Sequence, residues 1–298
     1  MVSTRGKAGL RERVPLGGSA SPSVELSWYG ISEIGRRRET NQDSFVTLPP
    51  LFAVADGMGG HSAGEIASAA AVRRLAELGG ATRISDGDIE EALGDAVDDI
   101  ELEAGESELG AGTTATGVVL GDDPEQPSWR VFNIGDSRVY QYFDGELTQL
   151  TVDHSVVQHL LDTGAITEEE AEYHPHANVI TRAVGFNEPP VPDFSSVALI
   201  PGQRLLICSD GLTKELTDAG IEHFLRTGES AEGAAHALVQ HALDNAGRDN
   251  ITVIVIEVHR FIESQAVDGA APESGAAAAG PVGMEHADAD DTLEVPKV

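Results

Sequence analysis

The chain has 298 residues, of which 41% are hydrophobic and only 5% aromatic, and its formal net charge at pH 7 is −31. This length allows one large domain or two small ones, with a core built mainly from aliphatic side chains. The negative charge argues against nucleic acid or an anionic membrane as a partner, because both attract basic surfaces. A phosphorylated substrate stays compatible with it if bound cations reverse the charge locally.

The sequence favours a cytoplasmic protein. Cys208 is the single cysteine, so an internal disulfide is impossible, which suits a reducing cytosol. The basic residues near the N-terminus are not followed by an apolar segment, so no signal peptide is expected. No stretch approaches the ~20 apolar residues that a membrane-spanning helix needs.

Composition divides the chain into three regions. Residues 1–24 are rich in Gly, Ser, Pro and Arg, and we expect a flexible N-terminal extension. Periodic patterns begin near Val24 and end near Ile262, which places one folded domain at 25–262. Residues 263–298 contain nine Ala, eight acidic residues and no aromatic. Such a segment buries too little to offset its ordering entropy, so we expect a disordered acidic, Ala-rich tail.

Hydrophobic periodicity predicts alternating clusters of strands and helices along the domain. Strands are predicted at 45–54, 114–120, 129–134, 139–143, 197–200, 205–208 and 251–258. Helices are predicted at 62–78, 88–104, 154–163 and 231–246. The runs do not alternate strictly, and hairpin-like pairs such as 129–134 with 138–143 favour antiparallel sheets with separate helical layers. We therefore predict an α+β fold rather than a doubly wound one.

Four aspartates stand beside Gly or Asn at the edge of strand-like runs: Asp56, Asp136, Asp210 and Asp249. A carboxylate at a strand end is held by a rigid scaffold yet faces solvent, and an adjacent glycine lets a ligand approach closely. Several such ends brought together supply the oxygen ligands that Mg²⁺ or Mn²⁺ prefers. The pattern points to a metal-dependent enzyme.

These aspartates belong to six short motifs that follow one another along the domain. The motifs are RETNQD (38–43), DGMGGH (56–61), GTTA (112–115), GDSR (135–138), SDGL (209–212) and RDN (248–250). Together and in this order they resemble the bacterial form of the metal-dependent protein Ser/Thr phosphatases of type 2C. The resemblance runs from about Val24 to Val258. It implies a central antiparallel β-sandwich flanked by helical layers (αββα), with a metal site at one end.

The resemblance also implies the metal ligands. Asp56 should bridge two Mn²⁺ or Mg²⁺ ions, with the carbonyl of Gly57 on one of them. Asp210 and Asp249 should complete the other ion. Asp136, together with Asp210, matches the pair that holds a third, weaker ion in bacterial members.

Two further residues receive roles from the same motifs. Asp43 should act through water from outside the ligand set, and Arg38 should grip the substrate phosphate with its planar fork of donors. Two ions ~3.5–4 Å apart can lower the pKa of a bridging water. The implied mechanism is in-line attack of a metal-bound hydroxide on phosphorus, without a phosphoenzyme.

The general acid is not assigned by the motifs. Some family members carry a histidine at the middle of Asp-Gly-x-Gly-Gly, where it is thought to protonate the leaving alkoxide. Met58 occupies that position here and cannot donate a proton. His61 and His154 are nearby candidates, and a metal-bound water is another.

Residues 151–185 resemble the family's mobile flap, which lies beside the metal site. Selection of substrates by this flap is one interpretation, and a loop that merely covers a sheet edge is the other.

Three functions are compatible with these motifs. The first is hydrolysis of phosphoserine and phosphothreonine in proteins, opposing bacterial Ser/Thr kinases. The second is a non-catalytic, phosphoprotein-binding regulator of the same fold, against which the intact ligand set argues. The third is a phosphatase for small molecules. The expected partners are phosphorylated proteins, including Ser/Thr kinases and their substrates. Thr292, which has acidic neighbours in the tail, adds a possible phosphothreonine-binding domain as a partner.

Overall fold

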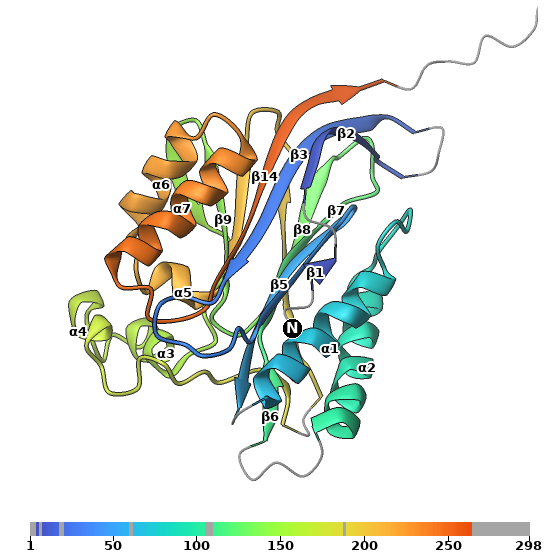
Figure 1. Cartoon of the computed structure of the whole chain (residues 1–298). Helices are drawn as coiled ribbons and strands as arrows, with labels where there is room; N and C mark the ends of the chain where they lie inside the picture. Colours follow the sequence, from blue (N-terminus) through green and yellow to red (C-terminus); the bar gives the residue numbers. More distant parts are fainter. Residues whose placement is uncertain are drawn as a thin grey trace, which may run out of the picture. The chain divides into compact units, whose positions relative to one another are not determined.

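Two β-sheets lie face to face, and helices cover the outer side of each (Figure 1). This arrangement is seen in a computed structural model, which describes residues 4–5, 8–17, 21–59, 62–104, 110–186 and 189–263. The αββα order confirms the predicted α+β fold.

The first sheet has the strand order β1-β4-β5-β7-β8-β12, with β6 paired to β5 and β11 paired to β6. All its pairs are antiparallel except that of β1 with β4. Its strands are β1 (Thr4–Arg5), β4 (Asp43–Leu48), β5 (Leu51–Gly59), β6 (Ala111–Thr113), β7 (Ala115–Leu120), β8 (Ser128–Ile134), β11 (Val184–Gly185) and β12 (Asp193–Ala198).

The second sheet is antiparallel throughout, in the order β10-β9-β13-β14-β3-β2. Its strands are β2 (Ala8–Pro15), β3 (Ser23–Glu33), β9 (Arg138–Phe143), β10 (Glu146–Gln149), β13 (Arg204–Cys208) and β14 (Ile251–Ile262). The long pair β3–β14 lies between β13 and the edge strand β2, and β14 ends at Ile262, where the domain was predicted to end.

The helices divide between the two outer faces and the flap. The first sheet is covered by α1 (Ala63–Glu77) and α2 (Asp86–Ala104), and the second by α5 (Asp210–Thr213), α6 (Asp218–Thr227) and α7 (Ala231–Asn245). Residues 151–185, the predicted flap, contain α3 (Val156–Asp162) and α4 (Glu168–Glu172). No helix in the described ranges is long and apolar enough to cross a membrane.

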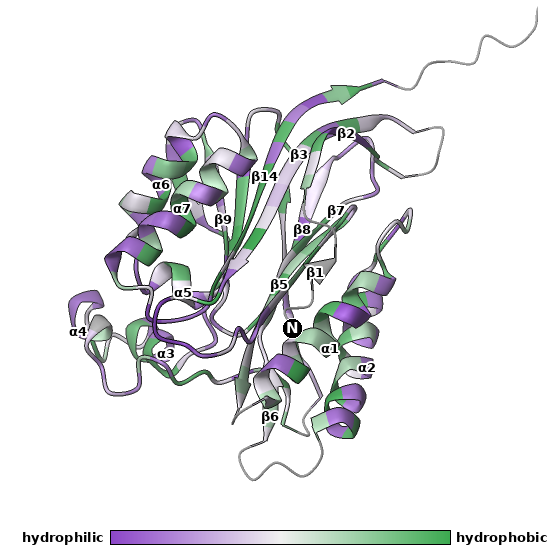
Figure 2. Cartoon of the chain, in the orientation of Figure 1, coloured by the Kyte–Doolittle hydropathy of each residue, from purple (hydrophilic) through white to green (hydrophobic). Residues whose placement is uncertain are grey.

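The core has three apolar layers, one beneath each group of helices and one between the sheets. Figure 2 shows hydrophobic residues along the strands and on the helix faces that meet them. Between the sheets, the ring of Phe52 makes edge contacts with Trp28 and Trp129, at centroid distances of 5.4 and 6.2 Å. Aromatic pairs at such distances and angles add specificity to the apolar burial that holds the sheets together.

The structure corrects the predicted hairpin of 129–134 with 138–143. β8 lies in the first sheet and β9 in the second, where β9 pairs with β10 and β13. The connection crosses from one sheet to the other through Gly135, whose φ of +108° is accessible to glycine. Hydrophobic periodicity does not show to which sheet a strand belongs, since β8 and β9 both keep their inward-facing apolar residues.

The structure also corrects the expected flexibility of residues 1–24. Residues 8–15 form β2, which pairs antiparallel with β3 at the edge of the second sheet. Val14 and the adjacent Leu16 are buried in the layer between the sheets, and Arg11 forms an ion pair of 2.7 Å with the buried Glu25. The Gly- and Arg-rich composition of this segment hides these few anchoring residues. The predicted tail, apart from Glu263, lies outside the described residues.

Candidate metal centre

The aspartates singled out in the sequence come together at one end of the sandwich, where β14 begins beside α5 (Figure 1). Asp43 and Asp56 are direct partners across the antiparallel strands β4 and β5. Asp210 opens α5 immediately after β13, and Asp249 precedes β14. Segments that are far apart in the sequence therefore place carboxylates at a shared end of both sheets.

Hydrogen bonds of its main-chain N–H and carbonyl fix the position of Asp56. Its N–H donates to Thr114 Oγ1 at 2.9 Å, and its carbonyl accepts from the N–H of Thr114 at 2.9 Å and from Thr113 Oγ1 at 3.0 Å. Burial, followed by the negative charges of Asp43 and the other aspartates, raises the pKa of Asp56 well above its usual range. The carboxylate is thus placed where only a cation would stabilise its charged form.

Gly57 follows Asp56 at a point where the chain leaves no room for a side chain. A Cβ on Gly57 would overlap the carbonyl oxygen of Gly64 in the first turn of α1. The N–H of Gly57 donates to the carbonyl of Gln42 at 3.1 Å. The close approach of α1 therefore requires the glycine and fixes the peptide that follows Asp56.

Asp43 is buried between hydroxyl groups of the second sheet. Its Oδ2 accepts from Thr252 Oγ1 at 2.7 Å and from Ser209 Oγ at 2.8 Å, whereas its Oδ1 is buried without a hydrogen-bond partner. Burial raises the pKa of Asp43 to about 7, aided by the charges of Asp210 and Asp249 and opposed by the two hydroxyls. An unpartnered buried oxygen is costly unless water or an ion satisfies it.

Asp249 is surrounded by donors. Its Oδ1 lies 2.7 Å from a guanidinium nitrogen of Arg38 and 2.9 Å from the N–H of Asn250, and its Oδ2 lies 3.1 Å from Lys214 Nζ. Burial would raise the pKa of Asp249, but Lys214 and Arg38 outweigh it and lower the pKa. Arg38 is thus found on a carboxylate, with 47% of its side chain exposed.

Asp210 shares Lys214 with Asp249. Lys214 Nζ contacts Asp210 Oδ2, and Asp210 Oδ1 is buried without a hydrogen-bond partner. Asp136 stands beside this pair, in the turn between β8 and β9, where Ser137 Oγ lies 2.9 Å from Thr114 Oγ1. Burial, then the charges of Asp210 and Asp153, raises the pKa of Asp136 to about 7.

The donor set fits hard divalent ions by its chemistry, although it is not a ready-made cage. Within the described ranges, no three carboxylates, imidazoles or thiols are already arranged around one metal position. Asp210 and Asp249 are instead held by ion pairs with Lys214 and Arg38. Two carboxylate oxygens, Asp43 Oδ1 and Asp210 Oδ1, are buried without a partner, and the aspartates repel one another. Such all-oxygen, negatively charged surroundings are the ones that Mn²⁺ and Mg²⁺ prefer.

The two histidine candidates have different outcomes. His61 lies outside the described residues. His154 is 7% exposed, and its Nδ1 accepts from the N–H of Gly135 at 3.2 Å. The proton must therefore reside on Nε2, which lies 3.1 Å from Asp193 Oδ2. With both ring nitrogens engaged at the base of the flap, His154 is poorly placed to act as a general acid.

The start of the predicted flap is hydrogen-bonded to the turn that carries Asp136. The N–H of His154 donates to the carbonyl of Gly135 at 2.9 Å, and the N–H of Thr181 donates to the carbonyl of His154 at 2.7 Å. Figure 1 shows α3 and α4 next to α5 at the same end of the sandwich. The flap is thus anchored beside the aspartates.

Sequence reasoning missed Lys214 and the hydroxyls of Ser209 and Thr252. Lys214 offered one signal: it is the single lysine between residues 8 and 263 of a strongly acidic domain, four positions after Asp210. Ser209 stands in the SDGL motif, but neither it nor Thr252 could be assigned to Asp43, because serine and threonine have many roles.

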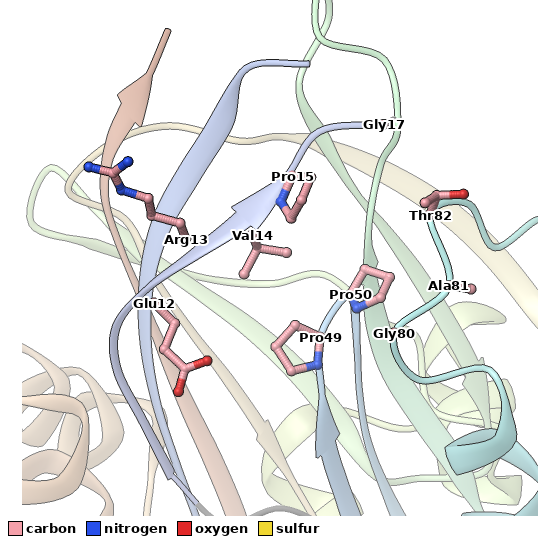
Figure 3. A pocket seen from close by; sticks show the side chains of 10 residues that line it. All are labelled: Glu12, Arg13, Val14, Pro15, Gly17, Pro49, Pro50, Gly80, Ala81 and Thr82. Carbon is pink, nitrogen blue, oxygen red and sulfur yellow. The ribbon is translucent and has the colours of Figure 1, made fainter. Parts of the chain in front are cut away.

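A pocket of about 250 Å³ lies away from the carboxylates, at the other end of β4 and β5. Figure 3 shows its apolar lining by Val14, Pro15, Pro49 and Pro50 between β2 and the β4–β5 turn. None of the candidate metal ligands lines it, so its position does not bear on the metal centre.

An αββα sandwich with a carboxylate cluster at one end and an arginine at its rim has the architecture of a metal-dependent phosphatase. The family model for protein phosphatase 2C matches residues 34–246. The chain belongs to the protein phosphatase 2C family.

Curated relatives carry matching names. The chain is 38% identical over 252 residues to the Ser/Thr protein phosphatase PstP of Mycobacterium tuberculosis, covering 80% of this chain and 46% of the relative. It thus spans about half the length of that relative. It is 35% identical over 236 residues to the Ser/Thr phosphatase stp of Listeria innocua, covering 75% and 92% of the two chains.

Solved structures agree with this assignment. The crystal structure of M. tuberculosis PstP superposes with a TM-score of 0.71 at 36% identity, covering 79% of this chain and 99% of that one. The PstP catalytic domain in complex with two manganese ions gives a TM-score of 0.69 at 36% identity, with the same coverage.

Proposed function

We propose that this chain hydrolyses phosphoserine and phosphothreonine esters in proteins and depends on Mn²⁺ or Mg²⁺ for this reaction. The observation that carries the proposal is the meeting of Asp43, Asp56, Asp210 and Asp249 at one end of the sandwich, with two buried carboxylate oxygens left unpartnered. The family and the names of its relatives support the same reaction.

Asp56, Asp210, Asp249 and the carbonyl of Gly57 would hold two ions. When bound, the ions supply Lewis acidity and offset the negative charge of the phosphate. Asp136 with Asp210 would hold a third, weaker ion. Asp43 would orient groups at the centre through water, since its Oδ2 is already fixed by two hydroxyls.

Arg38 would bind the phosphate. Its guanidinium is half exposed at the rim of the cluster, and a planar fork of donors matches two phosphate oxygens. In the present arrangement the guanidinium rests on Asp249, from which a rotation of its flexible side chain would release it. Because Met58 cannot donate a proton and His154 is engaged elsewhere, His61 or water would protonate the leaving alkoxide.

The partners follow from the reaction. Phosphorylated proteins, including Ser/Thr kinases and their substrates, would be dephosphorylated in the cytoplasm. The proposed recognition of phosphorylated Thr292 by a phosphothreonine-binding domain concerns a residue outside the described part of the chain, and it stays a prediction.

The test compares hydrolysis of a phosphothreonine peptide and of a small aryl phosphate, each with Mn²⁺ and with chelator. We expect Mn²⁺-dependent release of phosphate from the peptide, lost in Asp210→Ala and kept in Asp98→Ala, which removes an exposed carboxylate from α2. Equal activity of Asp210→Ala and wild type would contradict the proposal. Hydrolysis of the aryl phosphate alone would favour a small-molecule phosphatase, and no hydrolysis of either would favour a binding regulator.

A further inference from the structure

Lys214 lies inside the carboxylate cluster although none of the motifs includes it. Its Nζ contacts Asp210 Oδ2 and lies 3.1 Å from Asp249 Oδ2. The side chain is 31% exposed, so the ammonium is partly buried but still has a way out to solvent. The ammonium group of Lys214 is therefore a positive charge within the carboxylate cluster.

Local structure holds Lys214 in this place. Lys214 follows the last residue of α5, and its N–H donates to the carbonyl of Asp210 at 2.8 Å. Residues four positions apart face the same side of a helical turn, so the Lys214 and Asp210 side chains become neighbours. Asp249 is brought to the same ammonium by the start of β14.

The ammonium is kept charged by its surroundings. Burial alone would lower the pKa of Lys214, but the charges of Asp210, Asp249 and Asp56 outweigh it and raise the pKa. A permanent positive charge in this position offsets part of the repulsion among the aspartates. The metal-free cluster would be less stable without it.

Both carboxylate oxygens of Asp249 already have partners. Its Oδ1 is taken by Arg38 and by the N–H of Asn250, and its Oδ2 faces Lys214. A divalent ion on Oδ2 would meet the ammonium at close range, and like charges so near each other repel strongly in a partly buried site. One of the two must leave.

We propose that Lys214 is a resident cation that bridges Asp210 and Asp249 in the metal-free protein and competes with the divalent ion for Asp249. The inference rests on the proposed role of Asp249 as a metal ligand. Binding of the ion swings the ammonium toward solvent, so Lys214 weakens the affinity of this position while it stabilises the metal-free fold.

The first test measures Mn²⁺ binding by calorimetry on the metal-stripped protein. We expect Lys214→Met to bind Mn²⁺ at least about fivefold more tightly than wild type, which corresponds to about 1 kcal/mol. Arg83→Met is the control, because it removes a basic side chain that is 73% exposed and pairs with Asp122 on the surface. In chelator Lys214→Met should melt at a lower temperature than wild type, and saturating Mn²⁺ should close the gap.

An unchanged or weaker Mn²⁺ affinity in Lys214→Met would overturn the competition while leaving the proposed metal site standing. Absence of Mn²⁺ binding in both proteins would remove the metal site and this inference together. The two failures are thus distinguishable.

The second test needs no substitution and stands even if Lys214→Met fails to fold. The chain has three lysines, Lys7, Lys214 and Lys297, so wild-type protein with lysine labelled at Cε and Nζ gives three NMR signals. A metal titration can follow each of them. Adding Mg²⁺, which is diamagnetic, should move the Lys214 signal toward the position of a solvent-exposed lysine. A Lys214 signal that stays fixed while calorimetry records Mg²⁺ binding would contradict the proposal.

Discussion

Asp43 shows how a single buried carboxyl links the metal centre to stability. Its side chain is 1% exposed, and its pKa is raised mainly by burial, to about 7. The two hydroxyls on Oδ2 fix its orientation, and the bare Oδ1 leaves its charge uncompensated. In the absence of a nearby cation, the folded protein thus favours the protonated form of Asp43.

This raised pKa predicts a pH dependence for the metal-free protein. Between about pH 4 and pH 7 the unfolded chain has released a proton that folded Asp43 still holds, so the free energy of unfolding falls as the pH rises. The pKa rises by about 3 units from 3.8, and one unit equals about 1.4 kcal/mol, so the loss is on the order of 4 kcal/mol. The melting temperature measured in chelator should therefore fall from pH 4.5 to pH 7.5.

Asp43→Asn should make that decline shallower, because an amide does not titrate, but should not abolish it, since the pKa values of Asp56 and Asp136 are also raised. Asp98→Asn should leave the decline as it is in wild type. Equal slopes in Asp43→Asn and wild type would show that Asp43 does not titrate in this range. Saturating Mn²⁺ should reduce the slope in wild type, since ion binding favours the charged carboxylates.

Arg38 and its neighbour Arg37 provide a matched pair at the rim. Arg38→Ala should lower kcat/KM for a phosphothreonine peptide by about a hundredfold, as expected when a charge-assisted hydrogen bond worth ~1.5–3 kcal/mol is lost. Arg38→Lys should not restore it, because an ammonium lacks the planar fork. Arg37→Ala, which removes an exposed guanidinium next door, should stay within about twofold. Steady-state kinetics at saturating Mn²⁺ would decide, and equal values for Arg38→Ala and Arg37→Ala would contradict the role of Arg38.

At the scale of elements, the contact of α1 with β5 sets the position of the metal-binding turn. Gly57 and Gly64 face each other with no space for a Cβ on either. Gly57→Ala should therefore push α1 away from β5, destabilise the fold by about 2 kcal/mol or more, and weaken Mn²⁺ binding. Chemical denaturation and calorimetry measure the two effects.

The control for this substitution is Gly94, in the middle of α2. A Cβ there meets nothing within 4 Å, so Gly94→Ala should stabilise the helix by about 1 kcal/mol or less and leave Mn²⁺ binding unchanged. If Gly57→Ala behaved like Gly94→Ala, the close approach would not matter for the site.

The predictability of the elements depended on how local their signals are. The strands at 114–120 and 205–208 and the helix at 231–246 carry strong periodicity and were predicted within a residue. β2 was missed because its stabilising contacts, such as the pair of Arg11 with Glu25, join it to a strand that follows a turn-rich segment. The sheet membership of β9 was predicted wrongly because strand pairing is decided by tertiary packing, which periodicity does not encode.

The residues of the candidate site could be predicted from the sequence for a different reason. Asp56, Asp210 and Asp249 stand in motifs whose order resembles a known family, so their proximity was expected before any geometry was known. The hydroxyls that hold Asp43 and the ammonium of Lys214 were not, because they depend on which side chains face one another across β4, β13 and β14.

At the scale of the whole molecule, the centre exists only when both sheets and their connections are assembled. Asp56 comes from the first sheet, Asp249 from the start of the central strand of the second, and Asp136 from the turn that crosses between them. Ions held between carboxylates of these different segments would bind the folded protein and not the unfolded chain. Ion binding should therefore stabilise the fold as a whole.

The most direct measurement is anomalous diffraction near the manganese absorption edge from crystals of the Mn²⁺-loaded protein. We expect anomalous peaks beside the carboxylate of Asp56 and the carbonyl of Gly57 and beside Asp210 and Asp249, with Lys214 Nζ withdrawn from Asp249. Peaks confined to other acidic surfaces, or their absence with Lys214 still bridging Asp210 and Asp249, would contradict the assignment of this end of the sandwich as the metal centre.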